Sequence, residues 1–326
     1  MIDKRANGTG KVTVLTENPT TSRIYELFPK GCDVVGLRRS DPGAAERLAE
    51  TEVLISSGGL VIDRPLIEAM PNLKFVQSHG VGVDKTDVRL LWERGVLVAN
   101  TQGHNAISVA EHAMMLALVL SRRFIGPYRG LKERGAWQGA GEEAWELAGK
   151  SVGILGFGYI GKAVARMAQG FDMRVIAWQR RPERPRPPED GVEFFPLETV
   201  LRESDVLCIA TPLSQQTRGL IGADQLALMK PTAIIVNVGR GPIIDQVALI
   251  DAVQSGRLAG AGLDVTTSEP LPPGHPLLGV DNIVVTPHYA GGARDSRARG
   301  RQYVYDNVAR FLRGETPERL VTEDTL

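Results

Sequence analysis

Residues 151–181 read SVGILGFGYIGKAVARMAQGFDMRVIAWQRR, and this stretch decides the fold class of the chain. An apolar strand, Val152 to Leu155, runs into the turn Gly156-Phe157-Gly158-Tyr159-Ile160-Gly161. A helix of small and apolar residues follows, and a second strand is expected at Arg174 to Trp178. The stretch is one βαβ unit of about 30 residues with G-x-G-x-x-G at its first turn, the context typical of a dinucleotide-binding fingerprint.

Each glycine of this turn has a physical role in a nucleotide site. Gly156 permits the tight turn, Gly158 lets the backbone approach a pyrophosphate, and Gly161 lets helix and strand pack closely. The N-terminus of the helix would then offer N–H groups and a positive dipole end to the phosphates. The alternative is an ordinary glycine-rich βα turn, but strand, turn, helix and second strand in this order favour cofactor binding by residues 156–161.

The end of the second strand bears on the choice of cofactor. An NAD site usually has an acidic residue there, about 20 residues beyond the glycines, which accepts hydrogen bonds from the ribose 2′-OH. This chain has Gln179, Arg180 and Arg181 instead. Because a guanidinium offers a planar fork of donors to phosphate oxygens, we expect NADP(H) to be preferred, with NAD(H) possible. The alternative is a solvated basic loop, to which the prolines at 182, 185, 187 and 188 would also be suited.

Length and composition narrow the class of protein. A chain of 326 residues with 43% hydrophobic residues suggests two domains with ample cores. The net charge of zero gives no indication of a nucleic-acid or anionic membrane partner. No apolar run reaches transmembrane length, and Cys32 and Cys208 do not resemble a disulfide framework. We therefore expect a cytoplasmic protein.

Strands alternate with helices on both sides of the βαβ unit, which predicts parallel sheets covered on both faces. Before the unit, we expect strands at 11–15, 34–37, 53–56, 75–78 and 96–100, and helices at 21–28, 44–49 and 65–70. After it, we expect strands at 206–210, 233–237, 261–264 and 283–286, and helices at 223–229, 245–255 and 296–312. Residues 107–122 should form an apolar helix that is buried or lies in an interface, and residues 126–148 should be irregular.

This pattern predicts an α/β protein with two Rossmann-like, doubly wound parallel-sheet domains and a cleft between them. The substrate-binding domain is expected at residues 1–103, completed by the C-terminal helical segment 293–326. The dinucleotide-binding domain is expected at residues 104–292. Two chain crossings at one interface would make a hinge, so we expect closure over the substrate.

Three polar residues stand just past predicted strands of the second domain, where open α/β sheets bind their ligands. They are Arg240, Glu269 and His288. A cation to hold the substrate, an imidazole to exchange a proton with a carbonyl oxygen, and a carboxylate to orient the imidazole suit carbonyl reduction. Taken singly, each also fits an ordinary loop residue, so the pattern alone does not settle the chemistry.

Several motifs resemble the D-isomer-specific 2-hydroxyacid dehydrogenase family, in order and spacing, along nearly the whole chain. They are Val81-Gly82-Val83-Asp84, Asn100 to Gly103 with Val109-Ala110-Glu111-His112, Thr211-Pro212-Leu213 with Thr217 to Ile221, Asn237 to Gly241, the LDV…EP stretch and Thr286-Pro287-His288. The resemblance implies the same fold, and the apolar helix expected at residues 107–122 suggests a homodimer, as in similar proteins.

The resemblance also implies roles for individual residues. Arg240 would bind and polarise the 2-oxo acid, His288 would be the general acid of reduction, and Glu269 would be its partner. Val81 and Gly82 would donate backbone N–H groups to the substrate carboxylate. The cofactor would be contacted by Thr101, Thr211, Pro212, Thr217, Val238, Gly239, Asp264 and His288, with Thr101 near the nicotinamide and Asp264 on its carboxamide. No metal is expected.

Within that family, the stretch LDVTTSEPLPPGHPLL is most similar to glyoxylate/hydroxypyruvate reductases, which often use NADPH. We therefore expect an enzyme that reduces small 2-oxo acids to D-2-hydroxy acids. One alternative is an NAD-dependent D-2-hydroxyacid or phosphoglycerate dehydrogenase, and another is a non-catalytic, corepressor-like protein that binds NAD(P). The run Tyr289 to Ala293 lacks the Ser or Thr common after the family's histidine, and His79 and His104 stand where they could tune specificity.

Overall fold

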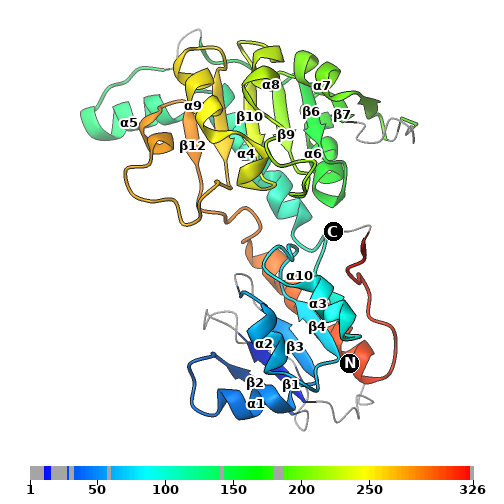
Figure 1. The fold of residues 1–326 in the computed structure, drawn as a ribbon. Coiled ribbons are helices and arrows are strands. Elements are labelled where there is room, and N and C mark those ends of the chain that lie inside the picture. The colour runs from blue at the N-terminus through cyan, green and yellow to red at the C-terminus, as the bar shows by residue number, and fades with distance from the viewer. Residues whose placement is uncertain are drawn as a thin grey trace. The chain divides into compact units, whose positions relative to one another are not determined.

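The computed structural model describes residues 11–15, 28, 33–56, 60–139, 143–178, 187–188 and 190–323. These residues fall into two compact units (Figure 1). The first unit is drawn from Met1–Asn105 and Arg294–Leu326, and the second is Ala106–Ala293. Each unit is an α/β structure built on one parallel sheet, so the predicted fold class of two parallel-sheet α/β domains is confirmed.

The sheet of the first unit has the order β2-β1-β3-β4-β5, with every pairing parallel. Its strands are β1 (Val12–Leu15), β2 (Val34–Leu37), β3 (Val53–Ser56), β4 (Phe75–Ser78) and β5 (Leu97–Ala99). The residues of β1, β3 and β4 are all buried, which explains why these strands read as short continuous apolar runs rather than as alternating patterns.

Helices cover both faces of this first sheet. One layer is made by α1 (Ala44–Glu50), α2 (Arg64–Glu68) and α3 (Val88–Glu93). The side chains of Asp63 and Asp87 accept hydrogen bonds from backbone N–H groups of the first turns of α2 and α3, and thereby fix where these helices begin. The other face is covered by α10 (Arg294–Leu312), whose Phe311 stacks on Phe75 of β4 at 4.9 Å between ring centroids.

The sheet of the second unit has the order β12-β11-β10-β9-β6-β7-β8 and is also parallel throughout. Its strands are β6 (Ser151–Leu155), β7 (Arg174–Trp178), β8 (Glu193–Phe195), β9 (Val206–Ile209), β10 (Ile234–Asn237), β11 (Gly260–Leu263) and β12 (Ile283–Val285). The order reverses direction between β6 and β9, and this is the switch point at which open α/β sheets bind ligands beyond the carboxyl ends of their strands.

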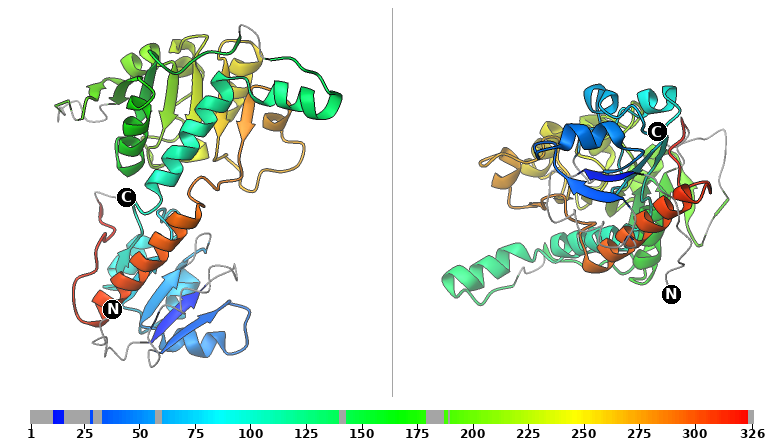
Figure 2. Two further views of the ribbon diagram at one scale, coloured as in Figure 1. Left: turned by 180° about the vertical axis from the view of Figure 1, so that it is seen from behind. Right: turned by 90° about the horizontal axis from the view of Figure 1, so that it is seen from below.

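The helices of the second unit also form two layers. On one face lie α4 (Ala106–Ser121) and α6 (Tyr159–Gln169), as the view from behind shows (Figure 2). On the other lie α7 (Leu197–Glu203), α8 (Ala223–Leu228) and α9 (Gln246–Gln254). Glycine in β11 lets α4 come close, because a Cβ on Gly262 would be 2.9 Å from the Cβ of Leu116. Two 3₁₀ turns, Gly241–Ile243 and Pro276–Gly279, complete the unit.

Four elements were not expected from the sequence: α3, α5 (Ile125–Arg134), α7 and β8. The expectation of irregular structure from residue 126 onward is wrong for 126–134, because Pro127 falls in the first turn of α5, where its missing N–H costs nothing. Within the C-terminal segment 293–326, the helix α10 spans Arg294–Leu312; it begins two residues before the expected Ser296 and ends at Leu312 as expected, and Gly314 follows it with a φ of 77°. The helix expected at 21–28 lies outside the described residues except for Phe28.

No described helix combines the length and the apolar character that crossing a membrane requires. The thiol of Cys208, in the middle of β9, is free and buried, and its burial raises the pKa to about 12.

Candidate functional site

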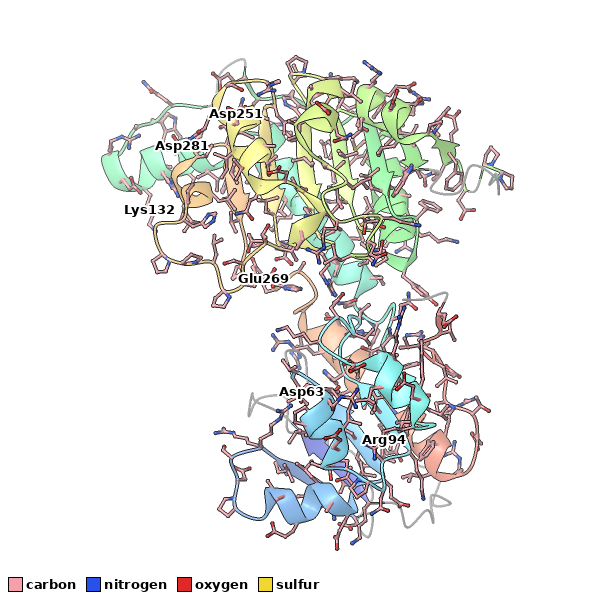
Figure 3. The ribbon with its side chains drawn as sticks, in the orientation of Figure 1. Asp63, Arg94, Lys132, Asp251, Glu269 and Asp281 are labelled. Atoms are coloured by element: carbon pink, nitrogen blue, oxygen red, sulfur yellow. The ribbon has the colours of Figure 1, made fainter. Side chains whose placement is uncertain are left out.

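The strands β10, β11 and β12 are neighbours in the second sheet and run in the same direction. Their carboxyl ends therefore meet at one edge, and Arg240, Glu269 and His288 stand on the three loops that leave it. Figure 3 shows the labelled Glu269 at this end of the second unit, opposite to Asp251 of α9. The structure thus places all three residues of the predicted trio at one rim.

Glu269 and His288 are in direct contact. The distance between Glu269 Oε2 and His288 Nδ1 is 2.7 Å, and the two side chains are 38% and 48% exposed. The other carboxylate oxygen of Glu269 accepts a hydrogen bond from the backbone N–H of Thr266 at 3.0 Å, so the carboxylate is held from both sides. A carboxylate on Nδ1 fixes the proton there and leaves Nε2 as the ring atom that can exchange a proton with a ligand.

Arg240 is held on a rigid loop. The side chain of Asn237 donates to the carbonyl of Arg240 at 3.0 Å and accepts from the N–H of Gly239 at 3.0 Å. The Arg240 guanidinium itself donates to the carbonyl of Gly239 at 2.8 Å. The next residue, Gly241, packs so closely that a Cβ would lie 2.0 Å from the carbonyl carbon of Thr266. The loop that carries Arg240 therefore abuts the loop that orients Glu269.

The glycine-rich turn has the shape that a nucleotide requires. Gly156 has a φ of +102°, and a Cβ there would lie 2.6 Å from the backbone N of Thr211. A Cβ on Gly161 would lie 2.2 Å from the carbonyl oxygen of Gly156, so this position needs glycine for helix and strand to pack. Gly158, the N-cap of α6, has nothing within 4 Å of an added Cβ. The space beside its backbone is open, as a bound pyrophosphate would need.

The other predicted cofactor residues of this unit divide into two kinds. Thr211 and Gly239 border the switch point, because a Cβ on Gly239 would lie 2.7 Å from the Thr211 carbonyl oxygen. Thr217 is fully buried, and its hydroxyl donates to the carbonyl of Pro212 at 2.7 Å, so that side chain shapes the loop rather than facing a ligand. The remaining residues of the set lie in or beside these turns: Phe157, Tyr159 and Ile160 in the fingerprint, and Val238 after β10.

The residues on which the cofactor preference depends are Gln179, Arg180 and Arg181. They follow β7, which ends at Trp178, and they lie outside the described residues. The predicted 2′-phosphate contact stays a prediction.

Asp264 is the most heavily hydrogen-bonded carboxylate of the site. It is 2% exposed and accepts from the backbone N–H groups of Tyr289 at 3.1 Å and of Ala290 at 3.0 Å. It also accepts from the hydroxyl of Thr286 at 2.7 Å, and Thr286 in turn contacts His112 of α4 at 2.9 Å. Sequence reasoning did not assign a role to His112 or Thr286. The available signal was a histidine inside an otherwise apolar helix.

The predicted substrate and nicotinamide residues of the first unit lie on the loops after β4 and β5. The carbonyl of Val81 accepts from the side chain of Asn100 at 3.0 Å. Among the described residues, no hydrogen bond uses the N–H of Val81 or Gly82, so both are available to an anion. Thr101 is fully buried and donates its hydroxyl to the carbonyl of His79 at 3.0 Å, which ties the two loops together.

His79 and His104 lie in a region of positive charge within the first unit. The His79 Nε2 is buried and has no hydrogen-bond partner among the described residues. Its burial, together with the charges of His104 and Arg301, lowers the pKa of His79 to about 4. Burial also lowers the pKa of His104, partly opposed by the bond from its Nδ1 to the Thr101 carbonyl.

This environment predicts that the first unit loses stability in acid. The pKa of His79 in the folded protein lies below the ordinary 6.5. Between pH 6.5 and about 4, His79 is therefore protonated in the unfolded chain but not in the folded one. Each pKa unit of difference corresponds to about 1.4 kcal/mol, so the free energy of unfolding should fall by about 3 kcal/mol over that pH window. Urea unfolding of wild type and His79→Gln at pH 7, 6, 5 and 4.5 measures it. The wild-type free energy of unfolding should fall more steeply than that of the variant, and parallel curves would contradict the assignment.

Comparisons with known proteins agree with this geometry. The family model for the D-isomer specific 2-hydroxyacid dehydrogenase, NAD binding domain, matches residues 114–290. The chain is 39% identical to a glyoxylate reductase of Korarchaeum cryptofilum over 284 residues, 86% of each chain. It is 36% identical over 305 residues to a D-3-phosphoglycerate dehydrogenase of Archaeoglobus fulgidus, covering 92% of this chain and 57% of that protein.

Among solved structures, the chain resembles an NADPH-dependent glyoxylate/hydroxypyruvate reductase from Sinorhizobium meliloti in complex with NADP and malonate. The TM-score is 0.83 and the identity 30%, over 97% of this chain and 98% of that chain. The matched family domain and the glycine-rich turn at the switch point of the second sheet both indicate a nicotinamide cofactor. The chain belongs to the D-isomer specific 2-hydroxyacid dehydrogenase family and is an NAD(P)-dependent enzyme of that family.

Proposed function

We propose that this chain is an NADPH-preferring reductase of small 2-oxo acids of the glyoxylate and hydroxypyruvate type, with His288 as general acid. The observation that carries the proposal is the 2.7 Å contact between Glu269 and His288 Nδ1, on the same rim of the sheet as Arg240. The names of the relatives from Korarchaeum cryptofilum and Sinorhizobium meliloti support the substrate class.

Each residue of the site has a separate role in the proposed reaction. The reduced nicotinamide, when bound, supplies the hydride that reaches the carbonyl carbon. Arg240 binds the 2-oxo acid and polarises its carbonyl, which favours negative charge on the oxygen. His288 donates the proton from Nε2 to that oxygen, and Glu269 stabilises the imidazole in its donating form and orientation. In the first unit, the N–H groups of Val81 and Gly82 bind the substrate carboxylate, so we assign this unit to substrate and the second unit to cofactor.

The preference for NADPH rests on Gln179, Arg180 and Arg181, which replace the acidic residue expected of an NAD site. The Sinorhizobium meliloti relative is NADPH-dependent and was solved with NADP, which supports the same assignment. The 36% identity to a D-3-phosphoglycerate dehydrogenase favours a second candidate, an NAD-dependent 2-hydroxyacid dehydrogenase. A non-catalytic NAD(P)-binding protein is the third, and the pairing of Glu269 with His288 argues against it.

Replacing Arg180 by Ala should raise the KM for NADPH by about ten- to a hundredfold, because one charge-assisted hydrogen bond contributes about 1.5–3 kcal/mol. The KM for NADH should change little, since NADH has no 2′-phosphate. Steady-state kinetics with both cofactors measure the effect, and Arg174→Ala, on β7 but paired with Glu203, is a control. A wild-type enzyme that used NADH at least as well as NADPH would contradict the preference.

The test of the function itself is a panel of 2-oxo acids assayed with NADPH and NADH in parallel. Glyoxylate and hydroxypyruvate should be the best substrates, and NADPH the better cofactor. Fastest turnover of a phosphorylated 2-oxo acid with NADH would favour the second candidate. No turnover of any member, with the cofactor still bound, would favour the third.

We also propose a homodimer in the cytoplasm. The α5 helix projects from the sheet of the second unit (Figure 1), and it carries apolar side chains into solvent. Phe124, Tyr128 and Leu131 are 52%, 48% and 45% exposed, and Trp137 just beyond the helix is 89% exposed. A patch of this kind on a soluble enzyme is typical of a protein interface, and a second copy of the chain is the partner we assign.

The free thiol of Cys208 suits a reducing compartment.

A further inference from the structure

A buried chain of hydrogen bonds connects α4 to the loop that carries His288. His112 Nε2 lies 2.9 Å from the hydroxyl oxygen of Thr286, although the two residues are 174 positions apart. The Thr286 hydroxyl donates to Oδ1 of Asp264 at 2.7 Å. His112 and Asp264 are 7% and 2% exposed, so water does not compete for these bonds.

The direction of each bond follows from the number of protons. The Thr286 hydroxyl has one hydrogen, and Asp264 receives it. The hydroxyl oxygen must therefore accept from His112, which places a proton on Nε2 of that ring. Burial lowers the pKa of His112 against the opposing charge of Asp264, which favours the neutral ring.

Asp264 in turn fixes the backbone around His288 through hydrogen bonds. Its carboxylate accepts from the N–H groups of Tyr289 and Ala290, and its backbone carbonyl accepts from the N–H of His288 at 2.9 Å. His288 has a φ of +49°, in the left-handed region that few non-glycine residues adopt. A backbone held in this conformation needs fixed partners, and Asp264 provides them on both sides of the peptide that follows His288.

We propose that His112 and Thr286 are positioning residues for reduction, which orient the catalytic His288 through the carboxylate of Asp264. The inference rests on the proposed role of His288 as general acid. The Thr286 hydroxyl donates to Asp264, and His112 Nε2 lies 2.9 Å from Thr286 and 3.5 Å from Oδ1 of Asp264, so both residues act on Asp264 rather than on His288 itself. His112 also packs edge-on against the ring of Tyr289 at 5.0 Å between centroids, so it contacts the His288 loop at a second point.

Two matched pairs of variants separate the hydrogen bonds from the packing. Thr286→Val removes the hydroxyl and keeps the shape, whereas Thr286→Ser keeps the hydroxyl. His112→Phe keeps a ring against Tyr289 and removes the N–H, whereas His112→Gln keeps an N–H donor at nearly the same place. Thr286→Val and His112→Phe should lower kcat about 10- to 100-fold, with the KM for the 2-oxo acid within about twofold of wild type, because the loss is one of orientation. Ser and Gln should recover most of it.

The double variant His112→Phe/Thr286→Val gives a further check. If both residues act through one chain of bonds, kcat should fall little below that of the worse single variant. Wild-type kcat in Thr286→Val and His112→Phe would overturn the proposal. So would losses that Ser and Gln fail to restore, or losses that follow thermal stability across all four variants, since these indicate a structural role only.

A spectroscopic measurement keeps the proposal testable if the wild type reduces no 2-oxo acid, a result that would count against the proposed function alone. The chain has five histidines, and in NMR spectra of isotopically labelled protein the ring resonance of His288 is the one that is lost in His288→Gln. In cofactor-free and cofactor-bound protein, Thr286→Val and His112→Phe should move that signal, whereas Thr286→Ser should leave it in place. An unmoved His288 signal in both would overturn the positioning role.

Discussion

Replacing His288 by Gln should lower kcat for 2-oxo acid reduction by about 10²–10⁴-fold, the usual contribution of general acid–base catalysis. The amide of Gln can still donate a hydrogen bond to the carbonyl oxygen, but it cannot transfer a proton. Binding of NADPH should survive, because the glycine-rich turn at residues 156–161 is unchanged. Single-turnover reduction and a fluorescence titration of the cofactor measure the two effects.

The control for His288→Gln is a substitution of its partner, Glu269. Glu269→Gln leaves the proton-donating ring in place and removes the carboxylate 2.7 Å from Nδ1, so kcat should fall less than in His288→Gln. Near-normal kcat in His288→Gln would remove this residue from the mechanism. Loss of cofactor binding in the same variant would show that the change had disturbed the second unit as a whole.

Replacing Arg240 by Gln should lower kcat/KM for the 2-oxo acid by about 10²–10³-fold, the cost typical of removing one donor to an oxyanion that forms in the transition state. Part of the loss should be in KM, because Arg240 binds the ground-state substrate as well. The KM for NADPH should change little. Arg257→Gln is the matched control, since that guanidinium pairs with Asp251 on the surface and should leave all constants near wild type.

The result that would count against Arg240 is a kcat/KM within about threefold of wild type. Gly241 lies against the backbone of Thr266, so a disturbance of the loop could also reach Glu269. Arg240→Lys distinguishes the two causes. A lysine restores charge but not the planar fork, so it should recover only a fraction of kcat/KM if the guanidinium itself acts on the substrate.

The parallel sheets were predictable because their strands are short, buried apolar runs bounded by turn residues. The strands β2, β3, β4 and β7 begin and end where the sequence predicts. By contrast, β8 is the three-residue edge strand Glu193–Phe195, whose residues are exposed or half-buried, so it lacks the apolar run on which such a prediction depends. The helix α5 was missed because Gly126, Pro127 and Gly130 have low helix propensity, and only the structure shows that the helix forms despite them.

The site was predictable to the extent that it depends on strand ends. Arg240, Glu269 and His288 follow three strands, and parallel strands that are neighbours must end together. The partnership of His112 with Thr286 could not be found in this way, because it depends on which face of α4 lies against the second sheet and on how far along the sheet the helix sits. Such a register between distant segments is set by the packing of many side chains, among them Leu116 against Gly262.

The buried thiol of Cys208 has a practical consequence for experiments on this protein. Because burial raises the pKa of this thiol to about 12, it is almost wholly protonated at pH 7, and only the thiolate reacts with maleimides or disulfide reagents. The chain has two cysteines, and replacing Cys32 by Ser would leave this shielded one alone. A cysteine introduced at an exposed position would then be the single reactive thiol of the folded chain. Fluorescent or spin probes could therefore be attached at a chosen residue without removing Cys208 from the core.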